Sequence, residues 1–216
     1  METGVVSTVA QHAESVLGKE GFRYVSAVVA NCKMLALELE MQEEDASSED
    51  TKESIDTEAL IIAGYLHDIS TVAHGFHEHH LKSAEMAVEF LGKLEIPAER
   101  MKKIEQAILV HTTVFTAEER NRAPIEGRIL YDADKLGRLS GLAVVTSLIE
   151  FGARYPNRAV TGDVLAAILR HIEERFVELY QSLNTAPARQ MAQEKFGNTL
   201  AFLDGIIEHL SDATPV

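Results

Sequence analysis

Apolar residues recur at spacings of three and four along nearly the whole chain of 216 residues. An α-helix has about 3.6 residues per turn, so this spacing gathers the apolar side chains on one face that can pack against a core. We find no stretch with the period of two that marks a half-buried strand, no internal repeat, and no linker long enough to require a second domain. The periodicity therefore predicts an all-α fold in which residues 1–216 form a single domain. The first apolar face consists of Phe22, Val25, Val28, Val29, Cys32, Leu35, Ala36 and Leu39.

Polar stretches, prolines and glycines divide this pattern into separate helices. The acidic stretch from Gln42 to Ser54 (about residues 42–55) is typical of a loop, and Asp56 or Thr57 is suited to cap the helix that follows. Pro97 is tolerated in a first helical turn, so another helix is expected there. Further along we expect a break over Thr116–Pro124, a helix near Ile129–Ile149, a connection at Pro156 and Gly162, and two long helices to the end.

Charge and cysteine content narrow the possible partners. The chain has 34 acidic and 20 basic residues, a net charge of −14. Nucleic-acid-binding proteins usually present a basic surface, so we expect no nucleic acid partner. No apolar run approaches the roughly 20 residues that span a bilayer, so we expect no membrane contact. Cys32 is the only cysteine, which excludes an internal disulfide and favours a cytoplasmic protein; its place on an apolar face favours burial over a role as nucleophile.

Histidines and aspartates are concentrated in two segments. Five of the nine histidines lie between His67 and His80, and the pair His67-Asp68 comes at the end of an apolar helical pattern. Asp68 follows Ile61 at helical spacing, so its carboxylate is expected to point partly toward the core, where it is costly unless it is paired or binds a cation. Imidazole and carboxylate are both good ligands of divalent first-row metals. Taken alone, this pair is also compatible with a surface pair at a helix end. The second segment, Tyr131–Leu136, contains Asp132 and Asp134, which alone are also compatible with helix capping or a solvated surface.

The order of these motifs resembles the HD superfamily of metal-dependent phosphohydrolases. The motifs are Leu66-His67-Asp68-Ile69, a histidine-rich loop, His79-x-x-x-Ser83-Ala84 at a helix start, Ile108-Leu109-Val110-His111, and Asp132-Ala133-Asp134-Lys135-Leu136. The segments that begin at His171 and Ser182 are similar to the YedJ-like branch, so the resemblance extends from about Phe22 to Leu210. It implies an HD-type helical bundle and a metal ion bound by His67, Asp68 and Asp134.

The resemblance also implies a second metal site. At one position, however, this chain departs from the family. In several branches two further histidines complete that site; His111 and either His79 or His80 match them, although spacing alone also allows His111 to be a core histidine. Where the family has a histidine on its first helix, this chain has Tyr24, whose phenol, with a pKa of about 10, is a poor substitute near neutral pH. The metal is then held by fewer residues and water, or by another histidine, or the site has lost activity. The candidate replacements are His12, His74 and His77.

We therefore predict a metal-dependent phosphohydrolase that acts on a small phosphorylated molecule such as a nucleotide, with Asp68 and His67 as catalytic residues. Its cofactor is a divalent ion, one or two of Mn, Fe, Co, Ni, Zn or Mg. Tyr24, Lys135 and Arg138 are the candidates for substrate binding, and the two basic residues are equally compatible with a solvated edge.

Two other functions stay open. One is an HD-fold module that binds a ligand or a protein with little catalysis, which Tyr24 favours. The other is a di-iron HD oxygenase, which needs both histidines of the second metal site. The long amphipathic helices also favour a homodimer.

Overall fold

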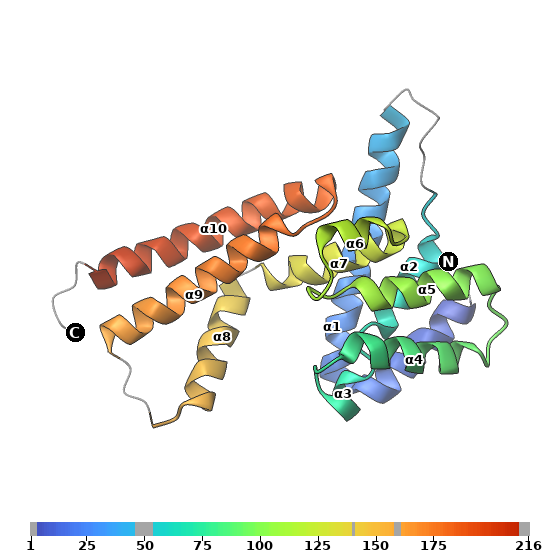
Figure 1. The fold of residues 1–216 in the computed structure, drawn as a ribbon, viewed down its shortest axis with the longest axis horizontal. Coiled ribbons are helices and arrows are strands. Elements are labelled where there is room, and N and C mark those ends of the chain that lie inside the picture. Colours follow the sequence, from blue (N-terminus) through green and yellow to red (C-terminus); the bar gives the residue numbers. More distant parts are fainter. Residues whose placement is uncertain (1–3, 46–53, 140, 158–160, 212–216) are drawn as a thin grey trace. The chain divides into compact units, whose positions relative to one another are not determined.

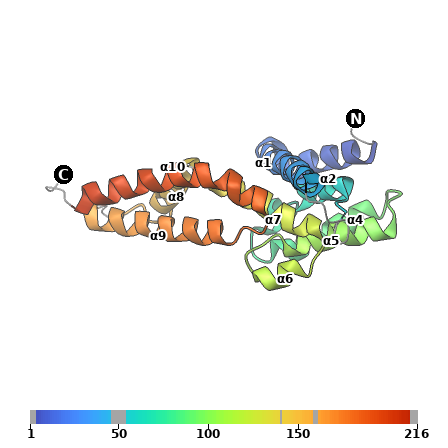
Figure 2. The same cartoon turned by 90° about the horizontal axis from the view of Figure 1, so that it is seen from above.

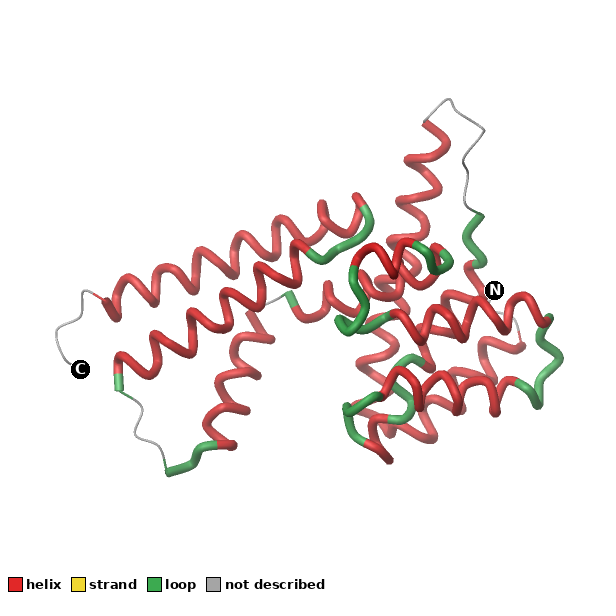
Figure 3. The backbone as a smooth tube through the Cα atoms, in the orientation of Figure 1, coloured by secondary structure: helices red, strands yellow, loops and turns green. Residues whose placement is uncertain are grey.

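The computed structural model describes residues 4–45, 54–139, 141–157 and 161–211, and every regular element within them is a helix. Figure 3 shows helices joined by short connections, with no strand in the described ranges. The prediction of an all-α fold is confirmed. The chain divides into two compact units, Met1–Asp134 and Lys135–Val216. That residues 1–216 form one domain stays a prediction.

Helix α1 (Gly4–Asp45) is 42 residues long and consists of two helical segments that meet at Gly18. Gly18 has φ 68°, a left-handed conformation that glycine adopts without steric cost. The predicted apolar face of α1 is buried at Val25, Val28, Val29, Cys32, Leu35 and Ala36.

The predicted acidic loop begins later than expected. Residues Gln42–Asp45 are the last residues of α1, so the prediction was wrong for them, whereas residues 46–53 lie outside the described part of the chain. Glutamate and glutamine are good helix formers, so acidic composition alone does not end a helix.

Helix α2 (Thr57–Leu66) is the central helix of the first unit. Asp56 caps it as predicted, because its carboxylate accepts a hydrogen bond from the Ala59 amide at 3.0 Å. All of its residues from Ala59 to Leu66 are buried, and it packs against α1 and α5 (Figures 1 and 2). At Gly64 the approach to α1 is so close that a Cβ atom would lie 2.8 Å from Val29 Cγ2. A helix surrounded by protein carries the residues that follow it into the interior.

The rest of the first unit follows in the order α3 (Thr71–His74), α4 (His79–Leu91), α5 (Ala98–Val110), α6 (Ala117–Asn121) and α7 (Ile125–Arg138). Helix α4 packs against α5, which begins directly after Pro97. The last residues of α7, from Lys135 on, belong to the second unit.

Two expectations for this region were wrong. The segment Thr116–Pro124 is not simply a break, since it contains α6. The hydroxyl of Thr116 accepts from the Glu119 amide, and the Glu119 carboxylate accepts from the Thr116 amide, a capping box that nucleates a short helix. The single helix expected near Ile129–Ile149 is two helices, because α7 ends at Arg138 and α8 (Gly141–Arg154) follows.

The second unit contains α8, α9 (Gly162–Gln181) and α10 (Ala186–Ser211). Helices α9 and α10 lie side by side as a helical hairpin in Figures 1 and 2. The rings of Tyr180 and Phe196 stack between them at 4.6 Å. The two long helices predicted for the end of the chain are thereby confirmed.

Within the described ranges, no single helix is long and apolar enough to cross a membrane; only the bent pair of α7 and α8 reaches that length and composition when both are taken together.

Candidate metal centre

The centre begins where α2 ends. His67 is the C-cap of α2, and the chain then turns through Asp68 and Ile69 to Ser70, all of them buried. Because α2 is apolar on every side, its end lies inside the first unit and these polar residues are drawn in with it. The structure thus confirms the expected burial of Asp68, whose exposed fraction is 6%.

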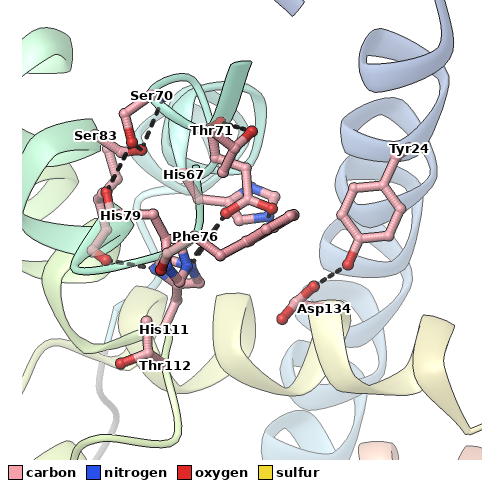
Figure 4. A network of polar contacts seen from close by, with 12 residues as sticks. Tyr24, His67, Ser70, Thr71, Phe76, His79, Ser83, His111, Thr112 and Asp134 are labelled. Atoms are coloured by element: carbon pink, nitrogen blue, oxygen red, sulfur yellow. Dashed lines mark hydrogen bonds and ion pairs between the residues drawn. The ribbon is translucent and has the colours of Figure 1, made fainter. Parts of the chain in front are cut away.

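Small hydroxyl residues join this turn to the start of α4 (Figure 4). Ser83 donates a hydrogen bond to the Ser70 hydroxyl at 3.0 Å, and Ser70 donates to the carbonyl of His79 at 3.1 Å. Thr71 donates to the carbonyl of Asp68 at 2.7 Å. These bonds hold the backbone of His79 beside that of Asp68. Sequence reasoning missed this role, because serine and threonine at these positions carry no distinctive pattern.

Three histidines of the centre are oriented by the same local contact. The Nδ1 atoms of His67, His79 and His111 lie 2.8, 2.8 and 2.5 Å from the carbonyl oxygens of Gly64, Phe76 and Ile108, each three residues upstream. A carbonyl only accepts, so each Nδ1 donates its proton, which leaves Nε2 to face the other residues of the cluster. A histidine that ligates a metal characteristically donates its other ring nitrogen in this way.

The Nε2 atoms converge on Asp68. Asp68 Oδ1 lies 3.4 Å from His79 Nε2 and 3.7 Å from His111 Nε2, and Asp68 Oδ2 lies 3.6 Å from His67 Nε2. Three potential ligand atoms, one each from His67, Asp68 and His111, lie within 4.8 Å of one another. Ligands about 2.0–2.2 Å from a common ion are about 3–3.5 Å apart, so a small inward adjustment suffices for these residues to share one.

Two buried atoms of the cluster make no hydrogen bond with the described residues, His67 Nε2 and Asp68 Oδ1. An unsatisfied buried polar atom costs about 1–3 kcal/mol. A cation between them satisfies both, so the donor set fits a divalent metal.

The electrostatics of Asp68 favour its charged form. Burial raises the pKa of this carboxyl, but the neighbouring His67 and His111 outweigh burial and lower the pKa to about 2. Asp68 is therefore a carboxylate throughout the neutral range, the form that binds a cation.

The other histidines lie outside this cluster. His80 follows His79 on α4 but packs edge-on against Phe115, with ring centroids 5.9 Å apart; burial, with the neighbouring His79, lowers its pKa. Of the two alternatives, the structure brings His79 and not His80 to Asp68. His12 stacks on Phe90 at 3.7 Å, and the side chains of His74 and His77 are exposed, so none of these three has replaced the first-helix histidine.

Tyr24 and Asp134 form a pair of their own beside the cluster. The Tyr24 hydroxyl donates to Asp134 Oδ1, and its ring lies 6.3 Å from that of His67 (Figure 4). The structure therefore places Tyr24 at the centre, as its position in the motif order implied. Asp134 is buried, with an exposed fraction of 1%, yet it is not part of the group of three potential ligands described above. Its role as a ligand stays a prediction.

Lys135 and Arg138 belong to the second unit. The Lys135 side chain is buried, and Arg138 is exposed at the end of α7. Their role in substrate binding stays a prediction.

Comparison with known proteins identifies the family. The HD domain family model matches residues 25–139, over half of the chain, beginning one residue after Tyr24. Three solved structures are similar over nearly their full lengths. An HD-superfamily hydrolase from Bacillus thuringiensis is 18% identical, covers 96% of this chain and 97% of its own, and has a TM-score of 0.66.

The Lin1889 protein from Listeria innocua is also 18% identical, with coverages of 97% and 99% and a TM-score of 0.66. YpgQ from Bacillus subtilis, in complex with ADP, is 19% identical, with coverages of 94% and 93% and a TM-score of 0.65. At these identities the likeness shows the fold alone. A search of curated proteins finds no match.

Proposed function

This chain belongs to the HD domain family, and on that premise we propose that it is a metal-dependent phosphohydrolase acting on a small phosphorylated molecule. The observation that carries the proposal is the convergence of His67, Asp68 and His111, with their ligand atoms within 4.8 Å of one another. The YedJ-like branch stays a prediction.

A divalent ion bound here supplies a water of lowered pKa and polarises a phosphoryl oxygen. The chain itself contributes ligands of fixed orientation, since the Nδ1 contacts hold the imidazole rings before any substrate arrives. Asp68, as a carboxylate, would accept a hydrogen bond from the attacking water and so orient it. The water oxygen bonds to phosphorus as the ester P–O bond breaks, and the alcohol leaves with a proton that the water releases.

We propose a nucleotide as the substrate class, supported by the complex of the relative YpgQ with ADP. The net charge of −14 repels an anionic substrate, so attraction must come from the bound ion and from local basic groups. Lys135 and Arg138 are our candidates for those groups. Arg138→Ala is then expected to raise KM for the nucleotide more than it lowers kcat.

The test combines metal analysis with a hydrolysis screen. The purified protein is analysed for bound metal and assayed with nucleotides and phosphate esters in the presence of Mn, Mg, Co, Ni or Zn. Asp68→Ala and His111→Ala are expected to lose both the ion and the phosphate release while circular dichroism still shows a helical protein. His209→Ala, an exposed histidine on α10, is the matched control and is expected to keep both. Metal and full turnover in Asp68→Ala contradict the proposal.

One observation keeps the di-iron oxygenase as a second candidate. His79 Nε2 and His111 Nε2 lie 3.1 Å apart beside Asp68, and that function needs both of these histidines. Two irons per chain together with oxygen consumption favour it, whereas metal-dependent phosphate release without oxygen consumption favours the hydrolase.

A further inference from the structure

We propose that the ring of Phe76 is a platform on which the base of a nucleotide stacks while the phosphate of that nucleotide lies at the metal centre. The inference rests on the proposed phosphohydrolase function and adds to it a binding residue in the loop between α3 and α4. Stacking contacts the flat face of a base and not its polar edge. The platform therefore favours nucleotides over other phosphate esters without selecting one base.

Phe76 lies directly beside the centre. Its ring centroid is 5.9 Å from that of His79, at an interplanar angle of 73°, and His79 Nε2 lies 3.4 Å from Asp68 Oδ1. In the view of Figure 4 the Phe76 side chain extends from its loop across the cluster, in the direction of Tyr24. A single imidazole therefore separates the phenyl ring from the carboxylate, and the groups attached to a phosphate at the centre are within reach of Phe76.

The phenyl ring is open to solvent although it is large and apolar. The exposed fraction of Phe76 is 69%. Two rings that meet at a steep angle touch through the edge of one of them, so His79 covers at most one face of the phenyl ring. An aromatic side chain has only two torsions to immobilise, so a flat ligand on the open face gains contact area at a small cost in entropy.

A single exposed apolar residue is common on protein surfaces, but Phe76 differs because its backbone is held in place. Its carbonyl accepts hydrogen bonds from His79 Nδ1 at 2.8 Å and from the His79 amide at 3.4 Å. Gly75 has φ 69° and Glu78 has φ 52°, which is an uncommon conformation for a residue other than glycine. Strained residues of this kind cluster at ligand-binding sites. The contact that orients His79 thus also fixes the loop that presents Phe76.

Other segments of the centre also expose apolar side chains. Val72 lies four residues after Asp68 and Val114 three residues after His111, with exposed fractions of 64% and 74%. The net charge of −14 repels an anionic ligand, whereas stacking and apolar contact do not depend on charge. A base that binds through such contacts adds affinity that the acidic chain does not oppose.

The shape of the exposed surface favours a base over an alkyl group. An alkyl group gains most where side chains enclose it, whereas a flat ring system gains from one open aromatic face. Phe76 presents such a face, so we assign a nucleobase as the group that covers it.

The test compares two ligands that differ only in the base, AMP and ribose 5-phosphate. Their affinities for the metal-loaded chain are measured by calorimetry, and KM and kcat are measured wherever phosphate is released. The wild-type chain is expected to bind AMP about 5- to 150-fold more tightly, the range that base–aromatic stacking spans. Phe76→Ala is expected to lose this preference and to keep its affinity for ribose 5-phosphate. For AMP its KM rises while kcat stays, because stacking stabilises the ground state and the transition state alike.

Two further variants define the cause. Phe76→Leu keeps an apolar side chain without an aromatic face and is expected to behave as Phe76→Ala does. Leu37→Ala is the matched control, because it removes an exposed apolar side chain about 20 Å along α1 from Tyr24, and it is expected to bind as wild type does. Bound metal is expected to be unchanged in all three variants, since His79 donates to the carbonyl of Phe76 and not to its side chain.

Phe76→Trp gives a readout of binding that does not depend on activity. The chain has no tryptophan, so the introduced indole is the only one, and a base stacked on it quenches its fluorescence. AMP is expected to quench the emission of the metal-loaded variant, whereas ribose 5-phosphate is expected to leave it unchanged.

The outcomes separate this inference from the proposed function. A metal-loaded chain that hydrolyses no phosphate ester overturns the proposed function, and the two affinities still test the platform. AMP that binds wild type no more tightly than ribose 5-phosphate, or a preference for AMP that Phe76→Ala keeps, overturns the role of Phe76 while the proposed function stands. A preference that Phe76→Leu keeps, with no quenching by AMP in Phe76→Trp, overturns stacking as the cause.

Discussion

Gly64→Ala tests the close packing of α2 on α1 that carries His67 and Asp68 into the interior. The new Cβ atom would lie 2.8 Å from Val29 Cγ2, about 1 Å closer than an ordinary carbon–carbon contact of about 3.5–4.0 Å. Val29 is β-branched and has little rotamer freedom in a helix. Overpacking of this kind costs about 1–3 kcal/mol, while alanine gains about 1 kcal/mol over glycine in helix propensity. The net change is a loss of about 0–2 kcal/mol in the free energy of unfolding.

The sharper measurement is a double-mutant cycle with Val29→Ala, read by urea unfolding with circular dichroism. In the Val29→Ala background the contact is gone, so Gly64→Ala is expected to stabilise by about 1 kcal/mol, and the coupling between the two sites is expected to be about 1–3 kcal/mol. Gly197→Ala, on α10 with no atom within 4 Å of its Cβ position, is the control and is expected to stabilise by about 0.5–1 kcal/mol. Equal effects of Gly64→Ala in both backgrounds, within about 0.5 kcal/mol, would refute the reasoning.

Three further predictions concern the cap, the site and the core. Burial raises the pKa of Asp56, but hydrogen bonds from Arg100 and the Ala59 amide outweigh it and lower the pKa. Its contribution to stability is therefore present above about pH 4 and is lost as the pH falls through the folded-state pKa. Asp56→Ala is expected to cost about 1–2 kcal/mol at pH 7 and less at pH 3, with Asp56→Asn in between because asparagine still caps; equal losses at both pH values speak against this cause. Ser70→Ala removes the bond to the His79 carbonyl and is expected to weaken metal binding about tenfold with little change in helical content, so unaltered affinity shows that the bond does not position His79. Ile62→Ala empties a fully buried position on α2 and is expected to cost about 2–5 kcal/mol in urea unfolding; a loss under 1 kcal/mol contradicts the packing described.

Local patterns in the sequence determined the class of fold and most helix positions. The buried face of α1 and the cap at Asp56 follow from side-chain spacing and from the hydrogen-bonding capacity of a single residue, both of which act within a few positions. The wrong predictions of helix bounds also have local causes. Gln42–Asp45 stay helical because their propensity outweighs their charge, and α6 forms because a Thr-x-x-Glu capping box lies inside a stretch that looks like a break.

The sequence also singled out the residue types of the site, because histidine and aspartate are chemically distinctive and the motif order resembles a known family. It did not reveal how they are held. The hydroxyl contacts of Ser70, Thr71 and Ser83 depend on where two helices meet, and no spacing rule predicts that for such common residues.

What only the tertiary structure decided is which of these candidates meet. His79 and His80 are neighbours in sequence, yet the rotation of about 100° between successive helical residues directs the first to Asp68 and the second to Phe115. Tyr24 and Asp134 are 110 residues apart, and their hydrogen bond exists only because α1 and α7 are brought together. Helix periodicity acts over one or two turns, so the sequence determines which face of each helix is buried. The residues that this face contacts are determined by the packing of the whole unit. That packing therefore decides which residues come together as the ligands of this centre.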